Sequence, residues 1–540
     1  MFRLRYMEYS FAFLVVCLTS IFALQVSKYQ FGGYDLSPVI DLQARIARGE
    51  IPGINFISTL PFTMILLIKI QTFFGGGWFS LIWLNVALFG ISVVLVLIFW
   101  PTCLGTEKLL LTILLMTMPL LYTNHLWHSA MSQFIAIDYL VVTLNYFLEP
   151  ESKWGLLRQV VLALLSGLLF FSKQNLGLPL LFVVVGIIAI SGMFRPEMRR
   201  SAMIFVSLQV FGVISVAGSL MLVFHTPLSV LIHSFTFVVG RTKLSAEQLQ
   251  VLLVKPKHIL FITLFSVFYL LLSFKRSKRQ IHIETTFLGA VALLIATVEL
   301  YRRNYDWVVL YTMIAYLFLL LGHPKKQKLL LLVLGVSLVV SQIPLVTDWD
   351  TNFNHAILPM FCMLLLTNLV GYELKSIVWV STLIAIFAAT AGGIARQRMH
   401  DVGPGAFWES AKLKRIDSGY FDGIYVGPHM IRVRNEIRVA IDKAGKSSRV
   451  FCGPRIEFCY EDNHLSSPPG LPLWWHPGSS YPLWMEKEVV NRFKMDRFTL
   501  IIFLHDDRTR IPQKILEYID KNYIRLNGFD DLDVYRPRTN

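Results

Sequence analysis

Charged side chains are scarce in this sequence, and their scarcity excludes an ordinary soluble domain. Aspartate, glutamate, lysine and arginine make up 16% of the 540 residues, whereas 55% are hydrophobic. Soluble globular proteins carry about 25% charged residues. The hydrophobic residues come in runs of about 15 to 23 separated by short polar loops, which fits a hydrocarbon layer about 30 Å thick. The composition therefore predicts a polytopic α-helical membrane protein.

Two motifs are also missing. No Gly-x-x-x-x-Gly-Lys-Ser/Thr run occurs, so nothing indicates a nucleotide-phosphate loop. No small-x-small cleavage site precedes Lys28, so residues 1–27 are predicted to form an uncleaved signal-anchor helix. The net charge of +15 comes largely from loops that orient spans, and we expect no nucleic-acid partner.

Cysteine is rare as well, with five residues in the whole chain. Cys17, Cys103 and Cys362 lie in or beside apolar runs, where a thiol packs like a small hydrophobe. Cys452 and Cys459 lie in the polar C-terminal part. Export of that part would permit a disulfide between them, but the spacing alone leaves the pairing open.

The apolar runs predict about thirteen transmembrane helices. We place them near residues 10–28, 78–100, 109–123, 129–148, 156–172, 176–193, 202–224, 258–273, 285–300, 306–321, 329–345, 356–371 and 376–394. Basic loops at 195–200, 275–279 and 325–328 should be cytoplasmic, as should the N-terminus. This orientation places both ends of loop 29–77 on the outer side, so segment 57–74 cannot cross the membrane. We expect a short surface or re-entrant helix there.

This topology divides the chain into two parts. Residues 1–395 should form the transmembrane domain, with loop 29–77 on the outer side and a surface helix near 38–48. Residues 396–540 should form a small extracytoplasmic α/β domain. Its expected elements are strands at 448–451, 499–504 and 531–535 and an amphipathic helix at 512–523.

The most informative residue is Asp35, which follows Gly32-Gly33-Tyr34 just past the first span. A carboxylate there can accept a proton from an acceptor hydroxyl or amine at the membrane surface. Alternatively, it caps a helix that begins at Ser37-Pro38. Asp41 follows six residues later and is expected to be solvated.

Further polar residues share the predicted outer face. Basic residues there run against the positive-inside tendency, so they are candidates to bind a lipid-linked phosphate: Lys173, Arg241, Arg302 and Arg303. Candidate contacts to acceptor or sugar are Asn55, His125, His128, Asp348 and His355. The alternatives are lipid-facing snorkelling for the cations and plain hydrogen bonding for the histidines. The residues indicate no certain cofactor, and a divalent metal stays open.

The aromatic stretch 472–478 in the C-terminal part has two interpretations. Trp and Tyr faces stack on sugars, so the stretch could recognise an acceptor. It could equally be a packed loop over a small core.

The order of elements resembles the GT-C superfamily of polyprenyl-phosphate-sugar-dependent glycosyltransferases. The shared order is a signal-anchor span, the loop with Asp35, a Gly-x-Ile-Pro run ending at Pro52, a surface helix that begins at Pro61, many spans and an exported domain. It looks closest to the group of aminoarabinose transferases and protein O-mannosyltransferases. The likeness covers the membrane part in architecture and residues 33–62 in motif. Leu36 replaces a second acidic residue, and Thr59-Leu60-Pro61 replaces a Lys-Pro-Pro.

The resemblance implies an inverting glycosyltransferase of the bacterial inner membrane. A sugar would pass from a polyprenyl phosphate to a lipid, glycan or protein acceptor, with Asp35 as base or acceptor-orienting group. Two alternatives remain: a transporter or flippase for a lipid-linked saccharide, and an O-antigen polymerase or ligase. Transporters often carry ionisable residues at mid-membrane, whereas here such residues are expected to gather at span ends.

Overall fold

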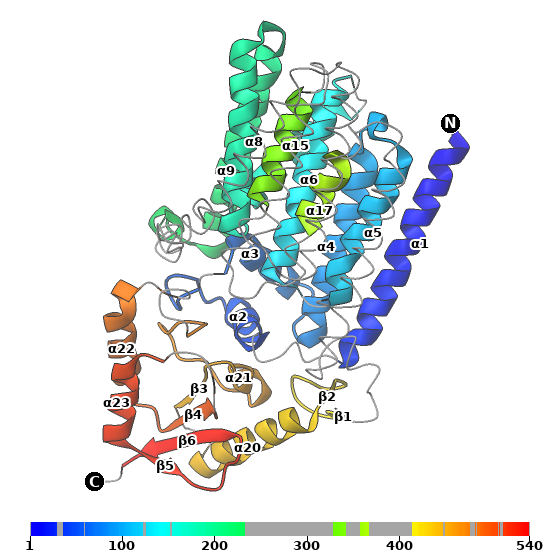
Figure 1. Ribbon diagram of the computed structural model, residues 1–540. Coiled ribbons are helices and arrows are strands. Elements are labelled where there is room, and N and C mark those ends of the chain that lie inside the picture. Colours follow the sequence, from blue (N-terminus) through cyan, green and yellow to red (C-terminus); the bar gives the residue numbers. More distant parts are fainter. Residues whose placement is uncertain are drawn as a thin grey trace, which may run out of the picture.

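The structure is a computed structural model that describes residues 2–29, 36–58, 60–122, 126–151, 154–232, 328–341, 357–366, 413–445, 449–475, 481, 483–505, 507 and 511–538. Within these ranges a helical bundle stands on a smaller domain that contains a sheet (Figure 1). The predicted spans 258–273, 285–300, 306–321 and 376–394 lie outside the described residues.

The bundle follows the predicted apolar runs closely. Its helices are α1 (Phe2–Val26), α4 (Trp78–Phe99), α5 (Thr106–Tyr122), α6 (His128–Leu148), α7 (Gly155–Phe170), α8 (Gln174–Phe194), α9 (Pro196–Phe224), α15 (Lys328–Val340) and α17 (Ile357–Leu366). Short 3₁₀ turns η1 (Ser27–Tyr29) and η3 (Thr102–Leu104) follow α1 and α4. Among the described residues, five helices are long and apolar enough to cross a membrane: α1 with η1, α4, α6, α8 and α9.

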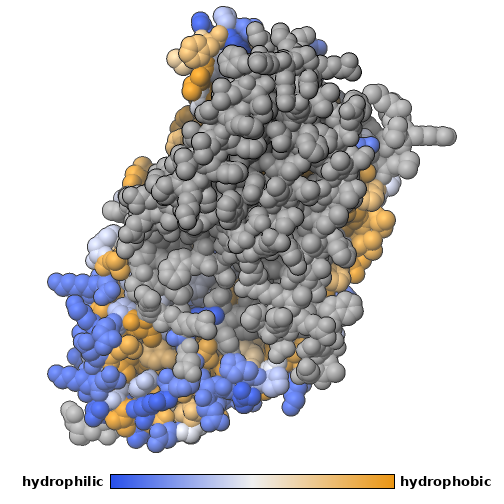
Figure 2. Space-filling view, viewed as in Figure 1, coloured by the Kyte–Doolittle hydropathy of each residue, from blue (hydrophilic) through white to orange (hydrophobic). Residues whose placement is uncertain are grey.

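Burial within the bundle separates a central helix from peripheral ones. In α6, 89% of the most apolar window is buried, against 22% in α1 and in α9. Phe13 and Leu18 of α1 and Phe211 of α9 are exposed. Figure 2 shows hydrophobic side chains along the edge of the bundle and hydrophilic ones gathered over the C-terminal domain. Apolar exposure of this extent is typical of helices that face lipid.

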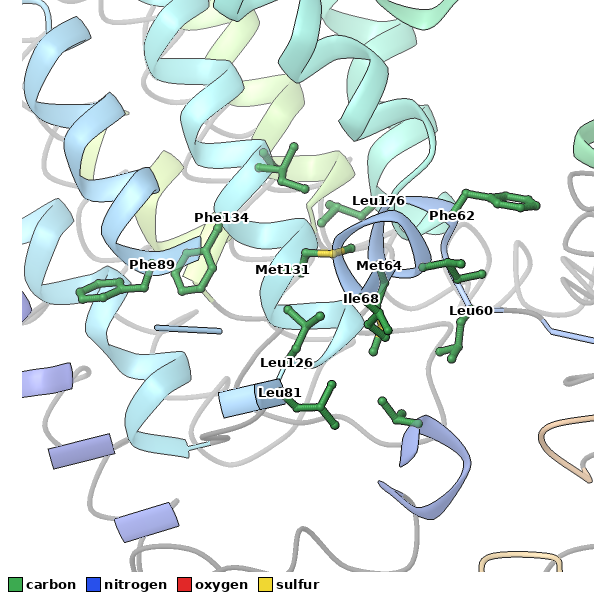
Figure 3. Packing of buried hydrophobic residues seen from close by; sticks show 14 of the residues in the cluster. Leu60, Phe62, Met64, Ile68, Leu81, Phe89, Leu126, Met131, Phe134 and Leu176 are labelled. Atoms are coloured by element: carbon green, nitrogen blue, oxygen red, sulfur yellow. The ribbon is translucent and has the colours of Figure 1, made fainter. Parts of the chain in front are cut away.

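Two short helices join the bundle to the C-terminal domain. They are α2 (Ser37–Ala47) and α3 (Phe62–Thr72), each of 11 residues. At 1.5 Å per residue, α3 is about 16 Å long, too short to cross a layer of about 30 Å. This confirms the short helices expected near 38–48 and within 57–74. Met64 and Ile68 of α3 pack beside Met131 of α6 and Leu176 of α8 (Figure 3).

The C-terminal domain is α/β, as predicted. A four-stranded sheet has the order β3-β4-β6-β5, in which β3 (Val450–Cys452) and β4 (Leu500–Leu504) are parallel. The other pairs, β4 with β6 (Leu532–Pro537) and β6 with β5 (Tyr523–Leu526), are antiparallel. Strands β1 (Lys414–Arg415) and β2 (Tyr425–Val426) form a separate pair. The helices are α20 (Pro428–Ala444), α21 (Phe458–Asp462), α22 (Glu486–Met495), α23 (Gln513–Asn522) and the 3₁₀ turn η9 (Leu483–Met485).

Two strands of this sheet differ in how well the sequence predicts them. Strand β5 was not predicted, because Tyr523–Leu526 directly continues the amphipathic pattern of α23 and its pairing with β6 supplies the backbone partners. The fully apolar run of β4 was predicted because a strand covered on both faces reads as a continuous hydrophobic run.

Helices α7 and α9 meet backbone to backbone at a pair of glycines. A Cβ on Gly212 would lie 1.8 Å from the Ala163 carbonyl oxygen, and one on Gly167 would lie 2.4 Å from the Gly212 carbonyl oxygen. The Ser166 hydroxyl also donates to the Gln209 carbonyl across the same contact, at 3.3 Å. Small residues allow this close approach in apolar surroundings, where hydrophobic burial does not drive helices together.

We expect Gly212→Ala to destabilise the protein by about 1–3 kcal/mol, because α9 must move away from α7. The matched control is Gly218→Ala on the same helix, where a Cβ meets nothing within 4 Å. That control should be neutral or stabilising by up to about 1 kcal/mol, since alanine is the better helix former. Thermal unfolding of both variants in detergent compares them, and equal melting temperatures would contradict the close contact.

Candidate functional site at the domain-facing end of the bundle

The segment between α2 and α3 forms backbone hydrogen bonds with the C-terminal domain. Residues 55–57 run parallel to 470–473, with Gly470 N donating to Asn55 O at 2.6 Å and Leu473 N to Ile57 O at 3.0 Å. Ile57 N donates to Leu471 O at 3.2 Å. Residues about 415 positions apart in the chain thus share a short ladder, which fixes the domain against the first loop.

Asn55 has a structural role in this arrangement. Its side-chain oxygen accepts a hydrogen bond from the backbone amide of Ile51 at 2.7 Å and closes the turn 51–55. Gly53, with φ of +81°, supplies the left-handed position that the turn needs. The structure therefore accounts for Asn55 through the turn that starts the ladder, and the predicted sugar contact stays a prediction.

The expectation that Asp41 is solvated is wrong. Asp41 is 1% exposed, and its carboxylate accepts a hydrogen bond from Arg45 at 2.8 Å and another from the Ser467 hydroxyl. The six-residue step from Asp35 indicated only that the two need not share a face. It could not reveal that the C-terminal domain covers α2, a contact made by residues more than 400 positions away.

Arg45 is the centre of this buried polar cluster. Its guanidinium contacts Asp41, donates to Glu50 at 2.9 Å and donates to the Pro468 carbonyl at 2.9 Å. Burial lowers the pKa of Arg45, but the carboxylates of Asp41 and Glu50 outweigh it, and the net shift is upward. Arg48 extends the cluster to the surface through Glu50 and Glu461, both at 3.1 Å.

Lys173 lies at the same end of the bundle, at the turn between α7 and α8. The residue is 8% exposed, and its ammonium donates to the Ser129 hydroxyl at 2.9 Å. Its backbone amide donates to the Ser132 hydroxyl at 3.0 Å. The beginning of α6 thus holds both the backbone and the charged end of Lys173.

His128 is the first residue of α6 and stands directly before Ser129. Its ring packs edge to face with that of Trp127, with centroids 4.8 Å apart. Trp127 in turn packs against Trp474 of the C-terminal domain, at 6.0 Å. His128 and Lys173, both predicted as site residues, therefore lie at the same end of α6, where Trp127 packs against Trp474.

The two tryptophans of the aromatic stretch 472–478 have different surroundings. Trp475 is buried and packs on Phe451 and Phe493, so it belongs to the domain core. Trp474 points instead to the bundle. Residues 476–478 lie outside the described residues.

The remaining predicted site residues lie outside the described residues: Asp35, His125, Arg241, Arg302, Arg303, Asp348 and His355. Within the described ranges, no group of three or more histidine, cysteine, aspartate or glutamate side chains is arranged to hold a metal ion.

Two acidic residues escaped the sequence analysis. Asp138 lies in the middle of α6, is 2% exposed and accepts a hydrogen bond from the Ser92 hydroxyl at 2.7 Å. It contradicts the expectation that ionisable residues gather at span ends. Asp138 lies inside the predicted span 129–148, so the sequence alone already shows an acidic residue in the middle of a membrane-spanning helix.

Glu457 is the second missed acid, in the loop between β3 and α21. Burial raises its pKa to about 8, although its own backbone amide, the Ser37 side chain and the Arg455 amide favour the charged form; nearby Asp41 raises it further. Cys452 and Cys459 form a disulfide that closes this loop. Phe458 N donates to the Ser37 hydroxyl at 2.8 Å, so the loop rests on the first turn of α2.

No protein-family model matches the chain, and the search of curated proteins found no match either.

Proposed function

We propose that the protein is a membrane glycosyltransferase that moves a sugar from a polyprenyl phosphate to an acceptor at the outer side of a bacterial inner membrane. The observation that carries the proposal is the buried ammonium of Lys173 at the bundle end that meets the first loop and the C-terminal domain. A cation at the end of an apolar bundle is placed to meet the phosphate of a lipid whose tail lies along the helices.

The disulfide supports the proposed sidedness. Disulfides persist in oxidising compartments and are rare in the cytosol. Cys452 and Cys459 belong to the domain that the topology assigns to the extracytoplasmic side. The N-terminus would then be cytoplasmic, and the ladder between 55–57 and 470–473 would lie outside.

The proposed reaction is a direct displacement at the anomeric carbon. An acceptor hydroxyl oxygen bonds to the anomeric carbon, the bond to the phosphate oxygen breaks, and its electron pair leaves with the lipid phosphate. Asp35 takes the proton of the hydroxyl. Lys173 stabilises the charge that grows on the phosphate, and the predicted cations Arg241, Arg302 and Arg303 would assist it.

We expect Lys173→Met to lower transfer from a labelled polyprenyl-phosphate sugar by about 10²- to 10³-fold, the range for loss of a group that stabilises transition-state charge. Asp35→Asn should lower it by about 10²- to 10⁴-fold. The matched control is Lys108→Met, because Lys108 is equally buried but lies at the beginning of α5, at the far end of the bundle. Undiminished transfer by the Lys173 and Asp35 variants would refute the assigned roles.

A second candidate function, a flippase for a lipid-linked saccharide, is favoured by Asp138 alone. A carboxyl group in the middle of a membrane-spanning helix is costly and is common in transport pathways. Movement of a fluorescent lipid-linked saccharide across vesicles by the wild-type protein, without covalent transfer in the same assay, would select this function.

A further inference from the structure

The parallel strands β3 and β4 end at the same edge of the C-terminal sheet. Residues that follow the carboxyl ends of neighbouring parallel strands form the usual ligand crevice of α/β domains. Here β3 is followed by Gly453, Arg455 and Glu457, and β4 by His505 and Asp507. The strand register pairs Cys452 with Ile502, which brings the two sets of residues close.

An ion pair joins the two loops at this edge. Arg455 Nη1 lies 3.5 Å from Asp507 Oδ1, and the two side chains are 25% and 7% exposed. The Arg455 side chain is thus partly exposed, whereas the Asp507 carboxylate that pairs with it is buried. Asp533 of β6 contacts His505 at 3.2 Å on the neighbouring strand.

The backbone of the first loop is held in an unusual shape. Arg455 has φ of +70°, a left-handed conformation that is uncommon for a residue with a side chain. Its amide donates to Glu457 Oε1 at 3.0 Å, and a Cβ on Gly453 would lie 3.2 Å from that same oxygen. Such positions persist where the surroundings over-determine them and are frequent at binding sites. The disulfide and the contact of Phe458 with Ser37 provide that support.

We infer that this edge, built on Arg455 and Asp507 with Glu457 holding the Arg455 backbone amide, binds the hydroxyl groups of an uncharged saccharide. The guanidinium donates hydrogen bonds and the carboxylate accepts them, a combination that matches neighbouring sugar hydroxyls. A phosphate or carboxylate ligand is disfavoured, because Asp507 already neutralises Arg455 and would repel an anion. The loop after β3 leads into α21, which packs against α2 (Figure 1).

This inference rests on the proposed function in one respect: it names a glycan, rather than a protein or a lipid, as the acceptor. The binding itself needs no transfer. The loop that carries Arg455 also contacts the first turn of α2 through Phe458 and Ser37, so a bound saccharide would lie on the domain that meets the first loop.

The test is binding of the purified full chain in detergent to immobilised neutral hexose oligosaccharides, alongside their phosphorylated and uronate counterparts. We expect binding to at least one neutral oligosaccharide, and at least a tenfold weaker affinity in Arg455→Gly and in Asp507→Asn. Glycine keeps the left-handed backbone and removes the whole side chain, including the guanidinium. The control is Arg432→Gln, an exposed arginine of the same domain that pairs with Asp531 at 2.9 Å; it should bind as the wild type does.

Three results would overturn the site: no binding to any neutral saccharide, wild-type affinity in both site variants with unchanged melting temperatures, or preference for the phosphorylated or uronate probes. The transfer assay is read separately. Saccharide binding without transfer would refute the proposed glycosyltransferase activity and support the saccharide site. Transfer without saccharide binding would support the activity and refute the site.

Discussion

Arg45→Ala is expected to lower the free energy of unfolding by about 3–5 kcal/mol, the largest effect of any single substitution considered for this protein. The reason is the carboxylate of Asp41, which would stay buried without its cation. The substitution also removes the hydrogen bonds to Glu50 and to the Pro468 carbonyl. Because Pro468 belongs to the C-terminal domain, the loss should loosen the domain from α2 as well as lower stability.

Two further variants separate these causes. Arg48→Ala is the matched control, because Arg48 lies in the same cluster but is one-third exposed and should cost at most about 1 kcal/mol. The double variant Asp41→Asn/Arg45→Met removes both charges and should recover part of the stability. Thermal unfolding and limited proteolysis between the bundle and the domain measure the two effects. An Arg45→Ala protein as stable as Arg48→Ala would show that the cluster does not hold the parts together.

The second large effect is a pH dependence caused by Glu457. Its pKa is about 8 in the folded protein and 4.5 for an ordinary glutamate, so between these values the folded state retains a proton that the unfolded state has lost. Stability therefore falls as pH rises from about 4.5 to about 8, by up to about 1.4 kcal/mol for each pH unit, and then stays level. The sign is opposite to that of a carboxylate held by a salt bridge.

Glu457→Gln should remove this dependence. The amide stays neutral at every pH, so the variant should match the wild type near pH 4.5 and melt at a higher temperature at pH 8. Glu461→Gln is the control in the neighbouring helix, where burial raises the pKa but Arg48 opposes the shift. Melting temperatures measured from pH 5 to pH 9 compare the three proteins. A wild-type slope that persists in Glu457→Gln would assign the pH dependence to another group.

Most of the helical architecture could be predicted from the sequence. Runs of apolar residues located α4, α6 and α8 to within two residues and α9 at its C-terminal end, because a membrane selects helices by length and hydrophobicity. The strand β4 and the helix α23 followed from local patterns in the same way. The predicted number of spans, about thirteen, extends beyond the described residues and stays a prediction.

The contacts between distant segments could not be predicted. Asp41 was expected to be solvated on a surface helix, yet the Ser467 hydroxyl donates a hydrogen bond to it and its partner Arg45 donates one to the Pro468 carbonyl. The pairing of Cys452 with Cys459 was left open, and the structure joins them. The spacing of residues in the sequence does not show which surfaces come into contact. The environment of Asp41 depends on a distant segment of the chain, and the disulfide depends on the path of its loop.

The sequence by itself determined which of the described stretches are apolar helices, since hydrophobic length and periodicity are local properties. Only the tertiary structure decided that the first loop and the C-terminal domain share one backbone ladder. It also decided that Lys173 contacts the beginning of α6 and that Glu457 is buried in the loop next to the first turn of α2. Burial and pairing set the charge of a carboxyl group, and both depend on residues that sequence order keeps apart.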